Sequence, residues 1–466
     1  MNINQEIKRS TLLLDNREAI VSETDKEGKY LKRIFISGLM SLLLIFVIIF
    51  TLPSTVLSVK SLVEYATIVS LVIFLFVLLI RYFTILLLAY LYINQYTFKS
   101  TTGFYPFVSI IVPVYNEDKV VADSVKSLLD LNYSNYEIIV VNDGSTDKTK
   151  EVAEQLVGYQ KGRYSDVKVS LIDKPNGGKS KALNAGIRYS KAEIVLCMDG
   201  DSQLSPDSVR LAVRHFVNPE IGAVAGNVKV MNRGKFYTDL QALEYIEGLN
   251  MARSAQSFTR LVNIIPGPLG LFRKKAVEEA GFYSSDTFAE DADLTLKILA
   301  NGWKIYYEPN SISYTEAPEK LHQLLKQRYR WTRGILQSIR KHRNIMVNPT
   351  INFGDTIILW TMFYEALIWP VMNIMANVFF MVAALAFGFT SLIFFWWAGL
   401  ALLDLITALY CIAVEKEEFR LVWYAIVYRM FFILVIDICK AMSTVEEFLG
   451  IKMAWGKLER VGVAKA

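Results

Sequence analysis

Ala192-Glu-Ile-Val-Leu-Cys-Met-Asp-Gly-Asp201 is an apolar run of strand length that leads directly into an acidic turn. A second run, 136–142, likewise ends at the polar turn Asp143-Gly144-Ser145. Patterns typical of helices separate these runs, and strands that alternate with helices predict a sheet of parallel β-α-β units. Because open sheets of this kind bind ligands beyond the carboxyl ends of their strands, the two acidic turns are candidates for one binding site.

The same alternation continues on both sides of these runs and covers residues 105–315. We expect an α/β domain with a mostly parallel sheet and flanking helices. The predicted strands are 108–113, 136–142, 167–172 and 192–198, and the predicted helices are about 118–130, 147–157 and 179–189.

The composition excludes a purely soluble enzyme and a disordered chain. The 466 residues are 53% hydrophobic and 20% charged, and the mean hydropathy is +0.30. Soluble domains carry about 25% charged residues. Three scattered cysteines and three histidines argue against a disulfide framework and against zinc sites, and the net charge of +5 gives no reason to expect nucleic acid as a partner.

Long apolar stretches lie at both ends of the chain. Ile34–Leu52 has 19 uncharged residues, enough at about 1.5 Å per residue to cross a bilayer core of roughly 30 Å. A second stretch, Tyr65–Tyr96, is interrupted only by Arg81. Basic residues flank the first stretch on its N-terminal side, so the positive-inside tendency places the N-terminus and the α/β domain in the cytosol.

Three further apolar stretches follow the domain, at 356–388, 391–414 and 421–442. The number of crossings they make, and so the side on which the tail lies, stays open. Arg429 and Asp437 fall inside the last stretch, where ionisable groups are costly unless they are paired, reach the surface or line a polar cavity. All three explanations are kept for these two residues.

These features predict a multi-pass protein of the plasma (inner) membrane. Its expected divisions are a cytosolic N-terminal segment (1–33), two transmembrane helices (34–96), the cytosolic α/β domain (105–315), amphipathic interfacial helices (316–350), C-terminal transmembrane helices (351–442) and a tail (443–466). The interfacial helices are expected because basic residues alternate there with leucines and isoleucines at near-helical spacing.

Two local patterns point to anion and cation chemistry. Asp199 and Asp201 lie two residues apart in a turn, where both carboxylates can face one Mg²⁺ or Mn²⁺ ion. The alternative is that each Asp-Gly pair is an ordinary turn. Asn176-Gly177-Gly178-Lys179 precedes a predicted helix, and the amides and ammonium there suit an anion, although a solvated lysine-rich helix start is the simpler explanation.

Four motifs in order resemble those of the inverting family 2 glycosyltransferases, and the last is typical of the processive membrane branch that makes cellulose, chitin, hyaluronan and poly-N-acetylglucosamine. They cover about residues 105–345 and are Pro113-Val-Tyr-Asn-Glu117 with Asp143, then Asp199-Gly-Asp201, then Ala289-Glu290-Asp291, and then Gln327-Arg-Tyr-Arg-Trp331. The resemblance implies the sheet of the GT-A fold.

The resemblance also implies roles for the residues of the first motifs. Pro113, Tyr115, Glu117 and Asp143 would form the nucleotide pocket, with Tyr115 against uracil and Asp143 accepting the N–H of the base. Lys179 would contact the diphosphate.

The later motifs would supply the metal site and the base. Asp199 and Asp201 would hold the metal ion. Asp291 would be the general base, with Glu290 beside it. This chain has Ala289 where the family often has threonine, which leaves both carboxylates in place; without the other motifs, Glu290 and Asp291 would be explained as the cap of a helix.

The acceptor and the diphosphate would be bound by the last motif. Gln327, Arg328, Arg330 and Trp331 are the implied residues, with the indole as a platform for a sugar ring and an arginine on the pyrophosphate. Gly267, in the loop 265–273, resembles the acceptor-side loop of the same branch, although an ordinary Pro/Gly turn would also explain it.

Taken together, the sequence predicts processive inverting transfer from a cytosolic UDP-sugar to a growing β-linked polysaccharide, which then passes through the membrane. UDP-N-acetylglucosamine is the preferred donor and poly-β-1,6-N-acetylglucosamine the preferred product. The other expected partners are membrane lipids and accessory membrane or export subunits. Two alternatives remain, namely a non-processive lipid-directed glycosyltransferase and a cellulose-, chitin- or hyaluronan-type synthase with another donor. A transporter or scaffold that only senses nucleotide is a third.

Overall fold

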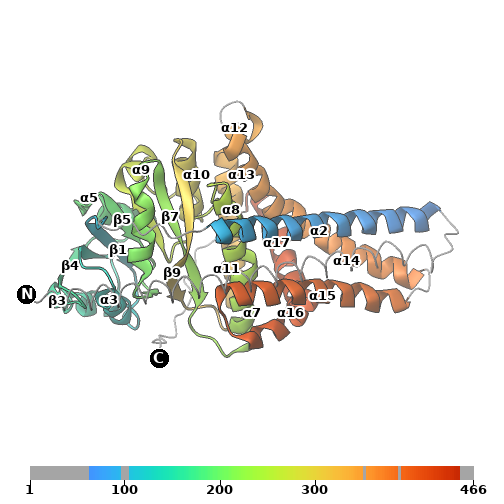
Figure 1. The fold of residues 1–466 in the computed structure, drawn as a ribbon, viewed down its shortest axis with the longest axis horizontal. Helices are drawn as coiled ribbons and strands as arrows, with labels where there is room; N and C mark the ends of the chain where they lie inside the picture. The colour runs from blue at the N-terminus through green and yellow to red at the C-terminus, as the bar shows by residue number, and fades with distance from the viewer. Residues whose placement is uncertain (1–61, 96–103, 350–352, 387–389, 452–466) are drawn as a thin grey trace, which may run out of the picture.

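The computed structural model describes residues 62–95, 104–349, 353–386 and 390–451, and all structural statements below concern those residues. The predicted segment 1–33, the predicted span 34–52 and most of the predicted tail lie outside them. Figure 1 shows an α/β domain from which several long helices extend to one side.

The domain is built on one nine-stranded sheet with the order β3-β4-β2-β1-β5-β8-β7-β9-β6. The strands β4, β2, β1 and β5 pair in parallel, as do β7 and β9, whereas β8 runs antiparallel to both of its neighbours. The α/β fold is confirmed, and the sheet is mixed. The strands are β1 (Val108–Val114), β2 (Tyr136–Asn142), β3 (Gly158–Lys161), β4 (Asp166–Asp173), β5 (Ile194–Cys197), β6 (Gln203–Leu204), β7 (Ile221–Val230), β8 (Gly270–Arg273) and β9 (Lys304–Thr315).

The four predicted strands are β1, β2, β4 and β5, within two residues at each end. They are apolar without interruption because both faces of the sheet are covered. Ile111 and Ile139 belong to the core on one face, and Ile110 and Ile138 to the core on the other. The short edge strand β3 was not predicted, since its sequence Gly-Tyr-Gln-Lys has no apolar run.

Helices cover both faces of the sheet, and the predicted helix 179–189 has the bounds of α5. The helices of the domain are α3 (Val121–Leu129), α4 (Thr149–Glu154), α5 (Lys179–Tyr189), α6 (Ser208–Val213), η1 (Arg214–Val217), α7 (Phe236–Glu244), η2 (Tyr245–Asn250), α8 (Met251–Phe258), α9 (Lys274–Glu279), α10 (Glu290–Ala300), α11 (Leu321–Lys341) and α12 (Arg343–Val347). Most of the predicted interfacial region is the single helix α11.

Four helices are long and apolar enough to cross a membrane, judged by length and composition: Val72–Asn94, Phe353–Val382, Trp396–Glu415 and Phe419–Phe448. In Figure 1 the helices α2, α14 and α15 extend away from the domain. The elements of this region are α2 (Leu62–Gln95), α13 (Phe353–Phe363), η3 (Tyr364–Ile368), α14 (Trp369–Ala386), α15 (Thr390–Glu415), η4 (Phe419–Trp423), α16 (Tyr424–Val427), η5 (Tyr428–Phe432) and α17 (Ile433–Phe448).

Pro370 does not divide the first C-terminal stretch into two separate helices. The helix continues from Phe353 to Ala386 and changes to π-helical geometry at Tyr364–Ile368, just before the proline. A proline removes one backbone N–H and crowds the preceding turn, and a wider turn accommodates both effects.

The ionisable groups of the helical bundle are paired, but one pair differs from the sequence-based suggestion. Arg429 does not pair with Asp437: its Nε and Nη2 lie 2.5 and 2.6 Å from the two carboxylate oxygens of Asp404, and Tyr82 donates to the same carboxylate at 2.7 Å. Asp437 instead accepts a hydrogen bond of 2.7 Å from Asn373. Helix periodicity within one stretch cannot reveal a partner on another helix.

Candidate active site

The carboxyl ends of three neighbouring strands carry the predicted nucleotide residues. β1 lies between β2 and β5, so Asp143 after β2, Glu117 after β1 and Asp199 after β5 follow adjacent strands. A Cβ on Gly200 would lie 2.1 Å from Oε2 of Glu117, so only glycine allows the acidic turn and Glu117 to approach this closely. The structure therefore brings the first two motifs together.

Asp143 is buried, and its carboxylate accepts hydrogen bonds from several groups of the chain. The amides of Gly177 and Gly178 donate to its carboxylate at 3.0 and 2.7 Å, and the Lys174 ammonium pairs with it. The carboxylate thus fixes the Gly-Gly turn before α5, a role that sequence reasoning did not identify. Its contact with a base stays a prediction. Lys174 was also missed, although its place directly after β4 is the same signal that identified Asp143.

Lys179, at the first position of α5, connects two residues of the predicted site. Its Nζ lies 2.6 Å from Oδ1 of Asp199, a predicted metal ligand, and 2.9 Å from Oε1 of Glu290, a predicted catalytic residue. Burial alone would lower the pKa of Lys179, but these two carboxylates outweigh burial and raise it above its ordinary value. A Cβ on Gly267 would lie 2.9 Å from the same Nζ, so the predicted acceptor loop reaches this cluster too.

Asp291 is in the first turn of α10, next to Glu290 in the chain. Burial, and then the charge of Glu290, raise the pKa of the Asp291 carboxyl to about 6, while Lys179 opposes the shift. The Ala292 amide donates to its Oδ1 at 2.8 Å. A carboxylate with this pKa is ionised near neutral pH and is basic enough to accept a proton, which suits a general base.

A buried cation faces these carboxylates from α8 and was not identified from the sequence. Arg253 interacts electrostatically with Asp291, and its Nε donates to the carbonyl of Ile264 at 3.3 Å, in the loop that leads to Gly267. Nothing in the local sequence Met-Ala-Arg-Ser distinguishes this arginine, because its proximity to Asp291 comes from the packing of α8 against β9 and the acceptor loop.

The proposed metal ligands differ in exposure. The Asp199 side chain is 27% exposed, whereas Asp201 is buried and hydrogen-bonded to the Ser202 hydroxyl at 3.3 Å. Within the described ranges, His, Cys, Asp and Glu side chains do not gather in groups of three or more suited to a metal ion. The pair fits Mg²⁺ or Mn²⁺, which needs one or two carboxylates when phosphate oxygens complete its shell.

Helix α11 carries the last motif at the boundary between the domain and the bundle. The Arg328 guanidinium donates to both carboxylate oxygens of Glu244, at 3.2 and 2.5 Å, and to Gln327 at 2.6 Å. It also lies over the Trp331 ring, 4.2 Å from its centroid. Arg328 therefore positions the indole. A diphosphate contact of Arg328 stays a prediction, and Glu244 is a partner that the sequence did not reveal.

Trp331 packs against the hydrophobic cluster that α2, α14 and α15 share with the domain. The indole is thus close to the long apolar helices, and its contact with an acceptor stays a prediction. Arg330, on the same helix, is half-buried, and Tyr115 lies just beyond β1 with its ring partly exposed. Pro113 is within β1, opposite Val141 of β2.

Gly334 lets α11 contact directly the residues that precede Glu290, which include Phe288 and Ala289 and are called the catalytic loop below. A Cβ at this position would lie 2.4 Å from the amide nitrogen of Ala289 and 2.7 Å from the carbonyl carbon of Phe288. Three residues further along α11, the side chain of Gln337 accepts a hydrogen bond of 3.1 Å from the Phe288 amide. The helix with the Gln-x-x-Arg-Trp motif and the residues before Glu290 are therefore one packed unit.

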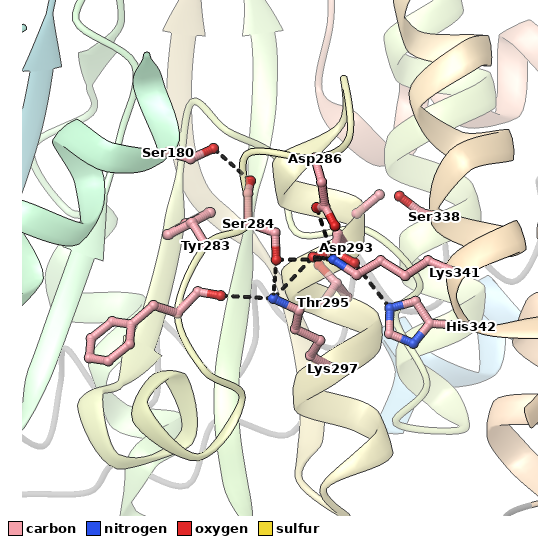
Figure 2. A network of polar contacts seen from close by, with 12 residues as sticks. Ser180, Tyr283, Ser284, Asp286, Asp293, Thr295, Lys297, Ser338, Lys341 and His342 are labelled. Carbon is pink, nitrogen blue, oxygen red and sulfur yellow. Dashed lines mark hydrogen bonds and ion pairs between the residues drawn. The ribbon is translucent and has the colours of Figure 1, made fainter. Parts of the chain in front are cut away.

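A polar network holds α10 in place next to the predicted catalytic carboxylates (Figure 2). Asp293 pairs with Lys297 at 3.1 Å, with Lys341 at 3.1 Å and with His342 at 3.1 Å, the last two at the end of α11. Burial alone would raise the pKa of Asp293, but these three partners lower it well below its ordinary range. The same network reaches Ser284, in the loop before α10.

Comparison with known proteins agrees with the motifs. Residues 109–281 match the family described as Glycosyl transferase family 2. The chain is 33% identical over 228 residues to a poly-β-1,6-N-acetyl-D-glucosamine synthase of Staphylococcus epidermidis, covering 49% of this chain and 54% of the relative. The same synthase of Staphylococcus aureus (strain COL) is 32% identical over 228 residues. This chain therefore matches about half the length of these relatives.

A solved structure supports the fold. A mannosyltransferase from Pyrobaculum calidifontis, solved with GDP-Man and Mn²⁺, aligns with a TM-score of 0.56 over 82% of this chain and 100% of its own, at 20% identity. The predicted α/β fold and the resemblance to family 2 glycosyltransferases are confirmed by these matches.

Proposed function

We propose that this chain is a membrane-embedded processive β-glycosyltransferase, because residues 109–281 match the model of family 2 glycosyltransferases. It transfers N-acetylglucosamine from cytosolic UDP-N-acetylglucosamine to a growing β-linked polysaccharide and passes the product through its own helices. The observation that carries this function is the cluster of Lys179, Asp199 and Glu290. The Lys179 ammonium lies 2.6 Å from Asp199 and 2.9 Å from Glu290, which come from two different motifs. The names of the staphylococcal relatives favour the donor and the product.

The cluster can perform one direct displacement. Asp291 accepts the proton of the acceptor hydroxyl, and that oxygen attacks the anomeric carbon as UDP leaves, so an α-linked donor gives a β-linkage. A general base of this kind contributes about 10²–10⁴-fold to the rate. Arg253 and Lys179 hold compensating positive charge beside the carboxylates, and Lys179 is close enough to the acidic turn to contact a diphosphate.

Asp199 and Asp201 would hold a divalent cation. A cation bound there would neutralise negative charge on the departing diphosphate. The chain's own contribution is to present two hard oxygen ligands on one turn and to keep Asp201 buried by the packing of Gly200 on Glu117.

Processive synthesis rests on the position of α11. Trp331 lies where the domain meets the bundle, and the same helix contacts the residues before Glu290 through Gly334. A growing chain whose end stacks on the indole would be held beside the catalytic base and directed toward the membrane helices.

The test uses membranes that contain the full chain and UDP-[¹⁴C]N-acetylglucosamine. We expect a polymer that is degraded by a hydrolase specific for β-1,6-linked N-acetylglucosamine, and no polymer from the Asp291→Asn variant. A discrete lipid-linked monosaccharide would support a non-processive lipid-directed enzyme, and incorporation of another UDP-sugar would support a related synthase. Normal polymer from Asp291→Asn would refute the assigned base.

A further inference from the structure

We propose that the last apolar helix, Phe419–Phe448, lies along the membrane surface on the side of the α/β domain and contacts lipid there, instead of crossing the bilayer. Its 30 residues are long and apolar enough for a span, so composition alone does not distinguish the two arrangements. Its contacts do. This inference concerns the placement of the helix and does not depend on the proposed function.

The N-terminal end of this helix is attached to the domain. Arg420 pairs with the buried Asp239 of α7 at 2.6 Å, and the ring of Tyr424 lies 6.2 Å from that of Phe236 at the start of α7. The preceding Glu417 pairs with Lys229 of β7 at 2.8 Å. The helix therefore begins at the level of the domain.

The C-terminal end is attached to the domain as well. Glu447 accepts from Arg333 at 2.7 Å and from Gln337 at 3.1 Å, and the carbonyl of Ile451 accepts from Arg333 at 2.6 Å. Both partners are on α11, whose residues Gly334 and Gln337 contact the catalytic loop. Because both ends are bound on one side, the helix cannot have them in opposite leaflets.

The course between the ends agrees with this arrangement. Cys439 and Glu446 contact Leu325 and Tyr329, so α17 runs beside α11 in the same direction. In Figure 1 α11 stands across the ends of the long helices α2 and α15 and not along them. A helix that follows α11 therefore lies across the bundle.

The orientation of the last apolar helix can also be judged from the depth, along α14 and α15, at which two of its polar residues make contact. Arg429 binds Asp404, fourteen residues from the far end of α15 at Thr390, and Asp437 binds Asn373, thirteen residues from the far end of α14 at Ala386. The two contacts are at nearly equal depth. In a helix perpendicular to the membrane, residues eight positions apart would differ in depth by about 12 Å.

One face of α17 is left to contact lipid. Ile438, Met442, Val445 and Leu449 are exposed and recur at helical spacing, whereas Ser443 on the opposite face is buried. This stripe is continuous with a membrane surface because α14, packed against α17, also exposes large apolar side chains such as Val378 and Val382. An amphipathic helix with this pattern is typical of the boundary between headgroups and acyl chains.

The first test measures on which side the two ends lie. Single cysteines at Glu418 and Ile451 are labelled with a membrane-impermeant maleimide in intact cells and in inverted vesicles, with Lys161→Cys on β3 as the marker for the domain side and the unsubstituted chain as background. We expect both positions to react from the same side as Lys161. Labelling of Glu418 and Ile451 from opposite sides would overturn the proposal.

The second test identifies what covers the stripe. A nitroxide is attached at Met442→Cys in full-length chain reconstituted in phosphatidylglycerol/phosphatidylethanolamine vesicles, with Val382→Cys on α14 as the matched site. We expect collisions with oxygen at both sites, and accessibility to a water-soluble nickel chelate several-fold higher at position 442 because the helix is shallow. Equal nickel accessibility at the two sites would show a buried span, and protection from both reagents at 442 alone would show a protein partner; either result overturns the lipid contact.

Discussion

Asp291 and Asp293 are two residues apart on α10, yet their surroundings shift their pKa in opposite directions. Burial and Glu290 raise the pKa of Asp291 to about 6, whereas the cations around Asp293 outweigh its burial and lower its pKa. One helix thus carries a carboxyl with a raised pKa and a carboxylate whose ionised form is favoured, and the difference comes from what surrounds each side chain.

The raised pKa of Asp291 predicts the pH dependence of sugar transfer. Only the ionised carboxylate accepts a proton, so the initial rate should fall about tenfold per pH unit once the pH is below about 6. The rate is measured between about pH 5 and pH 8 at limiting UDP-sugar, where it reports the pKa of the free enzyme. A rate that stays constant down to about pH 5, as expected for an aspartate with an ordinary pKa, would contradict the assignment, and Asp293→Asn should leave the position of the acid limb unchanged.

Gly334 predicts a second effect at the residue scale. An added Cβ would collide with the backbone of Phe288 and Ala289, so Gly334→Ala must separate α11 from the catalytic loop. Displacement of a catalytic group by about 1 Å can cost 10²-fold, and we expect at least a tenfold loss of kcat.

The matched control is Gly399→Ala on α15. A Cβ there meets no atom within 4 Å, and alanine in an open helical position favours the helix by about 1 kcal/mol. Equal activity of the two variants would show that the close approach of α11 is not needed.

Helix α10 is held to α11 by Asp293, whose side chain is fully buried among Lys297, Lys341 and His342. Asp293→Asn would leave Lys297 without its anion and remove one of the two carboxylates that pair with Lys341; removal of one partner of a buried ion pair costs about 3–5 kcal/mol. We expect a lower melting temperature of the purified chain in detergent. Asp286→Asn is the control, because Asp286 also pairs with Lys341 but is largely exposed.

The sign of the pH effect on this stabilisation follows from the lowered pKa. A carboxylate whose folded-state pKa lies below its unfolded value stabilises the fold at pH values above the unfolded pKa and loses that contribution as the pH falls through the folded one. The difference between Asp293→Asn and the unsubstituted chain should therefore be constant between about pH 5 and pH 8. A difference that disappears toward the acid end of this window would contradict the assignment.

At the scale of the whole molecule, Trp331 connects the catalytic domain with the bundle. Aromatic stacking contributes about 1 kcal/mol, so Trp331→Ala should shorten the residence of the growing chain about fivefold. We expect shorter polymer with a smaller change in the initial rate of UDP release. The product is sized by gel filtration, and Trp331→Phe, which keeps an aromatic face, should retain most of the length. Loss of both readouts in the phenylalanine variant would show that the indole is needed only for folding.

The sequence by itself determined the local elements and the chemistry they carry. Strands β1, β2, β4 and β5 are apolar runs, and each run and the residues that flank it are contiguous in the sequence. The polar turns that follow β2 and β5 identified Asp143 and Asp199. Lys179 was found because a Gly-Gly pair and a helix start are also local signals. Short-range periodicity and turn chemistry are sufficient for such features.

Only the tertiary structure decided which distant groups meet. Arg328 binds Glu244, 84 residues away in the chain, Lys174 binds Asp143, and Arg429 binds Asp404 and not Asp437. The sheet is mixed because β8 enters between β5 and β7 in the opposite direction and because the edge strands β3 and β6 also pair antiparallel with their neighbours. Such pairings depend on which apolar surfaces are buried together and on which buried charges find an opposite charge in the whole fold. A local sequence pattern does not identify the distant residue that will be the partner.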